Sequence, residues 1–258
     1  MVRTKGLTKW FGKTCAVREL DLEVARGEFF GFLGPNGSGK STTIKLLTTL
    51  LLPTRGSMEV AGHDVLSAPI AVKRVMGMLP EEIQTYERLS TNELIEFTGR
   101  VHGLRRRDIR QRSADLLDLM ELADADRDKL LLDCSMGMRK KAVLACALIH
   151  RPRVLFLDEP FNGIDARTSI TIRGLLNELV ASGTTIFFSS HILELVEKLC
   201  TRVAIIEDGE IKAQGTLPEL ALAAGLAADA PLEETFLQLV EARPQTEGSL
   251  SWLTSGSS

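Results

Sequence analysis

One short stretch restricts what this chain can fold into more than any other feature. Residues 34–41 read Gly-Pro-Asn-Gly-Ser-Gly-Lys-Ser and fit the pattern G-x-x-x-x-G-K-[ST] without a mismatch. An apolar run, Phe29–Leu33, precedes this loop, and a helical pattern over 39–51 follows it and stops before Pro53. A strand, a glycine-rich loop and a helix in this order predict an α/β fold with a phosphate-binding loop.

The residue types in this loop suit the binding of a nucleoside triphosphate. Glycines allow successive backbone N–H groups to surround an anion, and the helix N-terminus adds partial positive charge. We expect Lys40 to reach the β- and γ-phosphates and to serve catalysis, and the Ser41 hydroxyl to ligate Mg²⁺. An ordinary glycine-rich turn is the alternative interpretation, which the strand–loop–helix order disfavours. The residues expected to contact the nucleotide here are Gly34, Pro35, Asn36, Gly37, Ser38, Gly39, Lys40, Ser41 and Thr42.

Length and composition exclude several other classes of protein. The chain has 258 residues, of which 44% are hydrophobic and 25% charged, so disorder is excluded for the bulk of it. A net charge of −3 provides no global positive field that would attract nucleic acid. No run reaches the roughly 18 uncharged apolar residues that a membrane-spanning helix needs, and no secretory signal pattern is present. The four cysteines are far apart, which argues against disulfides and zinc and favours a reducing cytoplasm.

The order of patterns along the chain predicts one α/β domain with an insertion. Short β-rich runs dominate the N-terminal part, and Val75–Leu79 is a further expected strand. The patterns over about 88–150 are helical, and strands alternating with helices resume at Val154, which indicates a parallel sheet. We expect the domain to span 1–240. The tail 241–258, rich in Ser, Gly and Thr, is expected to be disordered.

Two carboxylates and a histidine follow apolar strands. Asp158 and Glu159 come directly after the continuous apolar run Val154–Leu157. Because ligands of open α/β sheets lie at the carboxyl ends of the strands, Asp158 can hold Mg²⁺ through water, and Glu159 can orient or deprotonate the attacking water. His191 follows the next apolar strand, 184–188, where it can hydrogen-bond the γ-phosphate and hold the water and Glu159 in place. The alternative interpretation is that Asp158 and Glu159 are solvated carboxylates at the end of a strand and that His191 has a structural role.

The order of these motifs resembles that of the nucleotide-binding subunit of ATP-binding-cassette (ABC) transporters over about Val2–Val240. The family signature, Leu-Ser-Gly-Gly-Gln, aligns with residues 134–138, where Ser135 and Gly137 match and the other three positions differ. The resemblance implies that Ser135 and Gly137 contact the γ-phosphate held by the other subunit of a dimer. A polar residue at a helix N-terminus suits this role, although a plain helix N-cap is the alternative.

Three further residues of this chain each match a single residue that has a known role in the family. Phe11 matches the aromatic residue that stacks on adenine, and Asp165 matches a loop that crosses the dimer interface. Glu81 stands where the family has a glutamine that senses Mg²⁺ and the membrane partner. Glutamate keeps an acceptor oxygen but adds charge and loses the amide donor. The resemblance therefore implies a metal site formed by Ser41, Glu81 and Asp158.

The family resemblance also implies the architecture and the activity. It implies an α/β P-loop NTPase fold with a parallel-sheet core, an N-terminal antiparallel β subdomain and an inserted α-helical subdomain. It implies an ATPase that dimerises head to tail, as a homodimer, around two ATP molecules and drives a separate membrane permease from the cytoplasmic face of the membrane. The segments Tyr86–Ser90 and Leu232–Leu237 favour an exporter over an importer.

Two functional alternatives and one docking hypothesis follow from the same resemblance. The alternatives are an ABC ATPase of soluble machinery that acts on ribosomes or DNA, and a regulatory cassette that binds ATP without hydrolysis. We expect the permease to dock just after Glu81, at Ile83, Tyr86 and Leu89. The alternative at these three positions is that they pack the helical insertion against the core.

Overall fold

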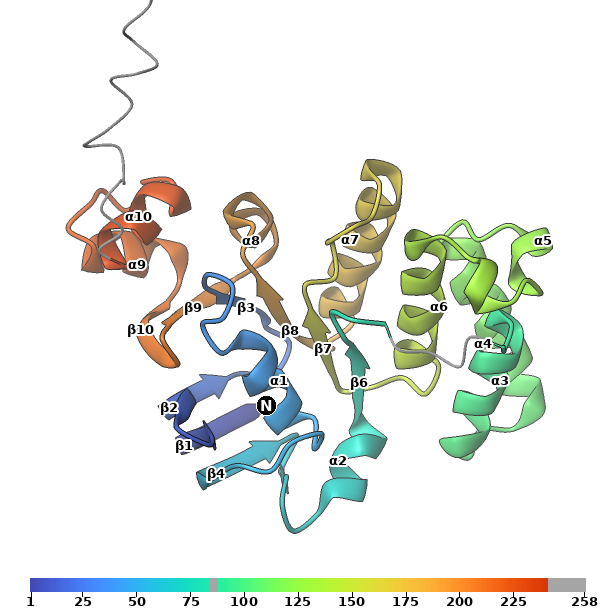
Figure 1. Cartoon of the computed structure of the whole chain (residues 1–258). Coiled ribbons are helices and arrows are strands. Elements are labelled where there is room, and N and C mark those ends of the chain that lie inside the picture. The colour runs from blue at the N-terminus through green and yellow to red at the C-terminus, as the bar shows by residue number, and fades with distance from the viewer. Residues whose placement is uncertain (84–87, 241–258) are drawn as a thin grey trace, which may run out of the picture.

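The computed structural model describes residues 1–83 and 88–240 of the chain (Figure 1). Its centre is a six-stranded sheet with the strand order β10-β9-β3-β8-β7-β6. All neighbouring strands in this sheet are parallel except the antiparallel hairpin of β9 and β10. The predicted parallel-sheet core is therefore confirmed. The strands are β3 (Phe29–Leu33), β6 (Met76–Leu79), β7 (Val154–Asp158), β8 (Thr185–Ser190), β9 (Arg202–Glu207) and β10 (Glu210–Gly215).

The central strands are apolar because both faces of the sheet are covered. Every residue of β3, β7 and β8 is buried. Along β7, Leu155 and Leu157 face the core cluster formed with α6, α7 and α8, whereas Val154 and Phe156 face the cluster formed with α1. Strands that are buried on both faces lose the apolar–polar alternation of a half-exposed strand, which explains the continuous apolar runs.

A second, four-stranded antiparallel sheet with the order β2-β1-β4-β5 covers one face of the central sheet. Helix α1 lies between the two sheets, and its Ile44, Leu46 and Leu47 are fully buried there. The predicted N-terminal antiparallel subdomain is therefore present. These elements are β1 (Val2–Phe11), β2 (Thr14–Val24), β4 (Arg55–Val60), β5 (His63–Asp64) and α1 (Lys40–Leu47).

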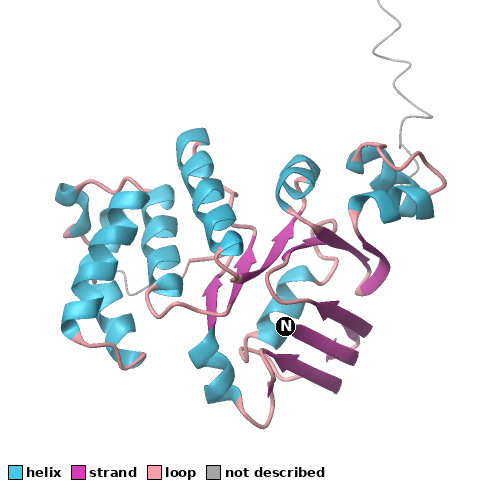
Figure 2. Cartoon of the chain, turned by 180° about the vertical axis from the view of Figure 1, so that it is seen from behind, coloured by secondary structure: helices cyan, strands magenta, loops and turns pink. Residues whose placement is uncertain are grey.

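A group of helices is inserted between β6 and β7 and lies beside the β6 edge of the central sheet (Figure 2). It begins at Ser90, whose side chain caps α3 and forms a capping box with Glu93. Helix α6 connects it to the core, because α6 packs directly on β6. The inserted elements are α3 (Thr91–Val101), α4 (Arg106–Leu119), α5 (Asp124–Arg127), the 3₁₀ turn η1 (Leu131–Asp133) and α6 (Met136–Leu148).

One helix was not predicted from the sequence, and several predicted boundaries differ from those in the structure. Helix α2 (Pro69–Val75) was not expected, and it takes Val75 from the predicted strand, which begins at Met76 instead. Helix α1 ends at Leu47 rather than near residue 51, because Thr49 adopts a positive φ of 64° that is incompatible with helix. The tail 241–258 lies outside the described residues. The other helices are α7 (Ala166–Ala181), α8 (Leu193–Leu199), α9 (Leu217–Ala223) and α10 (Leu232–Leu239).

The contact between α6 and β6 generates a stability prediction. A Cβ added at Gly77 would lie 2.2 Å from the backbone oxygen of Ala147 on α6. We therefore expect Gly77→Ala to lower the free energy of unfolding by about 1–3 kcal/mol, because helix and strand must separate. In the control Gly174→Ala, the added Cβ meets nothing within 4 Å in the middle of α7, and we expect stability to rise by about 0.5–1 kcal/mol. Urea denaturation of both variants measures the difference, and equal effects would contradict this packing.

Candidate functional site

The phosphate-binding loop connects β3 to α1. Close contacts with the backbone of other segments leave no room for a Cβ at two of its positions, which therefore require glycine. Gly39 has a φ of +105°, and a Cβ there would lie 2.4 Å from the backbone oxygen of Ala16. A Cβ at Gly34 would lie 2.2 Å from the backbone oxygen of Ile206. The loop borders a cavity of about 260 Å³ at the N-terminus of α1. That cavity is lined by Ala16, Asn36, Gly37, Gly39, Lys40, Ser41, Thr42, Glu81 and Glu159.

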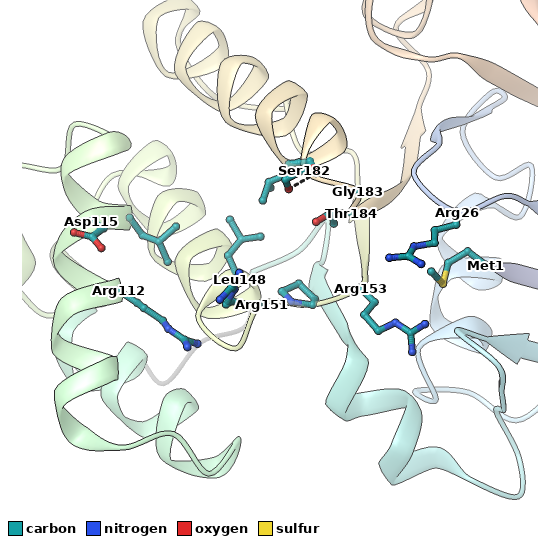
Figure 3. Close-up of a pocket in the computed structure, with 13 residues that line it drawn as sticks. Met1, Arg26, Arg112, Asp115, Leu148, Arg151, Arg153, Ser182, Gly183 and Thr184 are labelled. Carbon is teal, nitrogen blue, oxygen red and sulfur yellow. Dashed lines mark hydrogen bonds between the residues drawn. The ribbon is translucent and has the colours of Figure 1, made fainter.

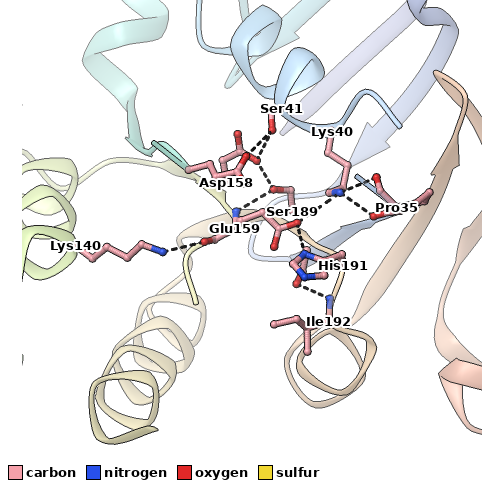
Figure 4. Close-up of polar contacts among 12 residues, drawn as sticks. Pro35, Lys40, Ser41, Lys140, Asp158, Glu159, Ser189, His191 and Ile192 are labelled. Atoms are coloured by element: carbon pink, nitrogen blue, oxygen red, sulfur yellow. Dashed lines mark hydrogen bonds and ion pairs between the residues drawn. The ribbon is translucent and has the colours of Figure 1, made fainter. Parts of the chain in front are cut away.

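The lysine of the loop is buried against the loop itself. The Lys40 side chain is 6% exposed, and its Nζ donates to the backbone oxygens of Gly34 at 2.7 Å and Pro35 at 3.1 Å. The same Nζ lies 3.5 Å from Oε1 of Glu159 (Figure 4). Nearby, the Ser38 hydroxyl is buried without a hydrogen-bond partner. A cation and an unsatisfied donor beside a helix N-terminus form a site for an anion.

Three oxygen-bearing side chains meet beside the cavity, and two of them, Ser41 and Glu81, line it. Asp158 is the last residue of β7 and is 2% exposed. Its Oδ1 accepts a hydrogen bond of 3.1 Å from Ser41 Oγ, which also lies 3.5 Å from Oε2 of Glu81. The structure thus brings together the three residues that the sequence analysis assigned to a metal. Two carboxylates and a hydroxyl are hard oxygen ligands of the kind that Mg²⁺ prefers, so this set fits that ion when substrate phosphates supply further oxygens.

The second carboxylate of the pair is held by the predicted histidine. Nδ1 of His191 lies 3.0 Å from Oε1 of Glu159, and the side chain of Glu159 is 4% exposed whereas that of His191 is 40% exposed. Glu159 therefore lies between Lys40 and His191 (Figure 4). A buried carboxylate beside an open cavity and a partly exposed imidazole can accept a proton from a water molecule and pass it on.

Sequence reasoning missed Ser189, which connects the carboxylate of Asp158 to the backbone of Glu159. Its Oγ donates to Oδ1 of Asp158 at 2.6 Å and accepts from the backbone N–H of Glu159 at 3.2 Å. Ser189 pairs directly with Asp158 in the parallel register of β8 and β7. The available signal was its place at the end of an apolar strand, two residues before His191, but the sequence alone does not show which strands are neighbours.

Two further predicted residues cap neighbouring helices. Ser135 is the N-cap of α6, where its Oγ accepts from the N–H of Met138, and Asp165 is the N-cap of α7. The hydrogen bonds from Thr168 lower the pKa of Asp165 below its ordinary value. A Cβ added at Gly137 would lie 3.7 Å from Oδ2 of Asp165, so the two helix N-termini are adjacent. None of these three residues lines the cavity beside the phosphate loop of their own chain.

The predicted adenine-stacking residue lies outside that cavity as well. Phe11 ends β1, is 47% exposed, and has the ammonium group of Lys9 5.0 Å from its ring centroid. Among the described residues, none of those that line the phosphate cavity is aromatic. An exposed ring remains available for a planar ligand.

A separate basic cavity of about 550 Å³ lies near the residues that precede the central strands β7 and β8 (Figure 3). Its lining includes Arg112 of α4 and Arg153, which directly precedes β7. Asp158, beside the phosphate loop, is at the other end of the same strand. The two cavities are therefore on opposite ends of β7. The remaining arginines of this second cavity are Arg26 and Arg151.

The fold and the site together define a P-loop nucleotide-binding protein, and comparisons with known proteins narrow the class. Residues 17–162 match the protein family described as ABC transporter. The daunorubicin resistance ATP-binding protein DrrA3 of Streptomyces coeruleorubidus is 40% identical, over 85% of this chain and 69% of that protein. The linearmycin resistance ATP-binding protein LnrL of Bacillus subtilis is 34% identical, over 85% of this chain and 70% of that protein.

Solved structures show the same fold. The structure of an ATP-binding subunit of an ABC transporter superposes with a TM-score of 0.87 at 30% identity, covering 93% of this chain and 99% of that one. An ATP-binding cassette solved as a dimer in a post-hydrolysis state with ADP and Pi superposes with a TM-score of 0.78 at 24% identity, over 84% and 99% of the two chains. The chain belongs to the ABC transporter family, as an ATP-binding and ATP-hydrolysing protein.

The position of Ser189 generates a prediction for hydrolysis. We expect Ser189→Ala to lower kcat for ATP by about tenfold, because Asp158 loses a donor and the backbone of Glu159 loses one of its acceptors. The control is Ser190→Ala, because among the described residues the Ser190 hydroxyl accepts from the N–H of Ile192 and bonds neither Asp158 nor Glu159. Release of phosphate by both purified variants measures the effect. Equal rates in the two variants would show that the bridge from the Asp158 carboxylate to the Glu159 backbone is dispensable.

Proposed function

We propose that this chain is the ATP-hydrolysing subunit of an ABC exporter and acts on a separate transmembrane subunit. The observation that carries the proposal is a network of contacts beside the phosphate loop. Glu159 lines the cavity together with Lys40 and contacts both Lys40 and His191, and Asp158 accepts a hydrogen bond from Ser41 of the same cavity. The names of the relatives, which are resistance proteins for daunorubicin and linearmycin, support an exporter of drug-like compounds. Among the described residues, no helix has the length and apolar composition to cross a bilayer.

In the proposed mechanism each side chain of the cavity has its own task. Lys40 leaves its loop carbonyls to bind the β- and γ-phosphates of ATP. Ser41, Asp158 and Glu81 would hold Mg²⁺, and the ion would supply positive charge beside the phosphate oxygens. Glu159 accepts a proton from the attacking water, and His191 keeps that carboxylate in place through its Nδ1 contact. The contact between Glu159 and His191 disfavours the alternative of a regulatory cassette without hydrolysis.

The active unit in this proposal is a head-to-tail homodimer around two ATP molecules. Ser135 and Gly137, with Asp165 beside them, would face the γ-phosphate bound by the other subunit, and Phe11 would stack on adenine. In support, the N-termini of α6 and α7 are adjacent and Ser135 is exposed, and helix N-termini favour an anion. The relative solved with ADP and Pi is itself a dimer. The domain that we propose to dimerise in this way spans residues 1–240 and includes the helical insertion at 88–150.

An apolar groove beside the helical insertion supports docking of a cytoplasmic helix of the transmembrane subunit. A cavity of about 540 Å³ is lined by β6, the strand that leads to Glu81, and by residues of α2, α3 and α6. Leu50, Ile70 and Val101 on its rim are 58%, 61% and 68% exposed. We place the docking surface in this groove and the protein at the cytoplasmic face of the membrane, as a peripheral subunit.

The three residues first expected to form the docking surface differ in their environments. Ile83 is half-buried, and Tyr86 lies outside the described residues. Leu89 packs against a small cluster within the helical insertion, and its backbone oxygen accepts from the N–H of Leu131. This supports, for Leu89, the alternative that it packs the insertion.

A pair of substitutions tests the proposed dimer. We expect Glu159→Gln to bind ATP but hydrolyse it at least about a hundredfold more slowly, because an amide is a far weaker base, so dimers accumulate. Adding Ser135→Arg to this variant is expected to prevent dimers, because a bulky cation would occupy the partner's phosphate site. Sedimentation with ATP measures both. The control Ser182→Arg changes an exposed serine at the end of α7 and should leave dimers intact. Dimers in the Ser135→Arg variant would contradict the composite site.

A second pair tests the docking groove. We expect Ile70→Asp to abolish co-purification with the transmembrane subunit while the isolated protein still hydrolyses ATP at the parent rate, because a charge would enter an apolar contact. The control Leu222→Asp changes a residue on α9 that is 62% exposed and lies outside the groove. Full complex formation by Ile70→Asp, or loss of the complex in both variants, would place the docking surface elsewhere.

A further inference from the structure

A buried lysine outside the expected site contacts the loop that carries Glu159. Lys140 lies in the second turn of α6 and is 1% exposed. Its Nζ donates to the backbone oxygens of Glu159 and Pro160, each at 3.1 Å, and to that of Asn162 at 2.5 Å. Figure 4 shows that the bond to Glu159 crosses from the inserted helices to the end of β7. One side chain therefore joins two parts of the fold that are distant in sequence.

The three hydrogen bonds satisfy all the donors of this ammonium group. A lysine ammonium has three N–H donors, and the loop presents three carbonyl oxygens to it. Burial lowers the pKa of Lys140, although the carboxylates of Glu159 and Glu81 raise it to a smaller extent. A buried cation without such partners is strongly unfavourable, so the loop and the lysine fix each other's positions.

The backbone of Glu159 needs to be held because its conformation is strained. Glu159 has a φ of +46°, in the left-handed region that residues with a Cβ rarely adopt. Its N–H lies within hydrogen-bond distance of the backbone oxygen and Oγ of Ser189, and its own carbonyl oxygen accepts from Lys140. Both peptide groups that flank Glu159 are therefore fixed. A strained conformation persists only where the surroundings determine it in this way.

We propose that Lys140 is a positioning residue that holds Glu159 in its left-handed conformation and connects it to the signature helix. The inference rests on the proposed role of Glu159 as the base. Lys140 follows Ser135, the N-cap of α6, by five residues on the same helix. A shift of α6 that follows occupation of the site at Ser135 would therefore reach the backbone of Glu159 through a single side chain. Hydrolysis of ATP in one subunit would thereby depend on whether Ser135 of that same subunit is in contact with the nucleotide held by its partner.

Substitution of Lys140 should separate catalysis from binding. We expect Lys140→Met, which keeps the volume and removes the donors, to lower kcat for ATP by at least about tenfold. The Kd for a fluorescent ATP analogue should stay within about twofold of the parent, because Lys40 and the phosphate loop are unchanged. Amide hydrogen exchange should rise over 159–162, where three carbonyls lose their donor. A merely structural role would lower stability without this separation of kcat from Kd.

Three comparisons complete the experiment. Lys140→Arg retains charge and donors and should recover part of kcat. The control Lys141→Met changes the next residue of α6, which makes no hydrogen bond to residues 159–162, and should hydrolyse ATP like the parent. If Lys140→Met does not fold, Lys140→Gln keeps two donors on a shorter side chain and should show the same fall in kcat with ATP binding retained.

The outcomes distinguish this inference from the proposed function itself. A parent-like kcat in Lys140→Met or Lys140→Gln, with Glu159→Gln inactive, would overturn the positioning role and leave Glu159 as the base. Full hydrolysis by Glu159→Gln would instead overturn the assignment of the base. An equal loss of kcat in Lys141→Met would also overturn the inference, because the effect would then belong to helix α6 as a whole.

Discussion

The parallel register of β7 against β8 is the constraint on which the rest of the site depends. It pairs Leu157 with Phe188 and Asp158 with Ser189. Both strands are buried on both faces, so a shift of register would misplace many apolar side chains at once. The hydrogen bond of 2.6 Å from Ser189 to Asp158 then fixes the carboxylate that faces the phosphate loop. Glu159 and His191 take their places only because they follow these two strands.

Buried charge is the second determinant of the architecture. Lys40 and Glu159 have side chains only 6% and 4% exposed, and leaving either without a partner would cost about 3–5 kcal/mol. The structure avoids this cost by placing Lys40 against two loop carbonyls and by placing Glu159 between Lys40 and His191. Lys140 follows the same rule with carbonyls alone. The site is therefore a network in which each charge has its hydrogen bonds.

The helical insertion meets the core at its last helix, α6, whose N-terminus lies beside that of the core helix α7. The N-caps of α6 and α7 are Ser135 and Asp165, and the two helix ends are adjacent. Helix α6 also packs on β6 so closely that Gly77 has no room for a side chain. The packing on β6 and the lysine bond to the Glu159 loop thus hold one helix at two points of the core. In the proposed role of Lys140, this arrangement is the route by which a part of the chain outside the nucleotide cavity would affect hydrolysis.

The sequence by itself determined the local elements and the identity of the main site residues. The phosphate loop, the apolar runs of β3 and β7, and the positions of Asp158, Glu159 and His191 at strand ends follow from residue type and spacing, which are local properties. Only the tertiary structure decided which strands are neighbours, and hence the roles of Ser189 and Lys140. It also placed α2 where a strand was expected to begin. The physical reason is that hydrogen bonds between distant segments depend on strand order and helix packing, and local residue patterns do not record either.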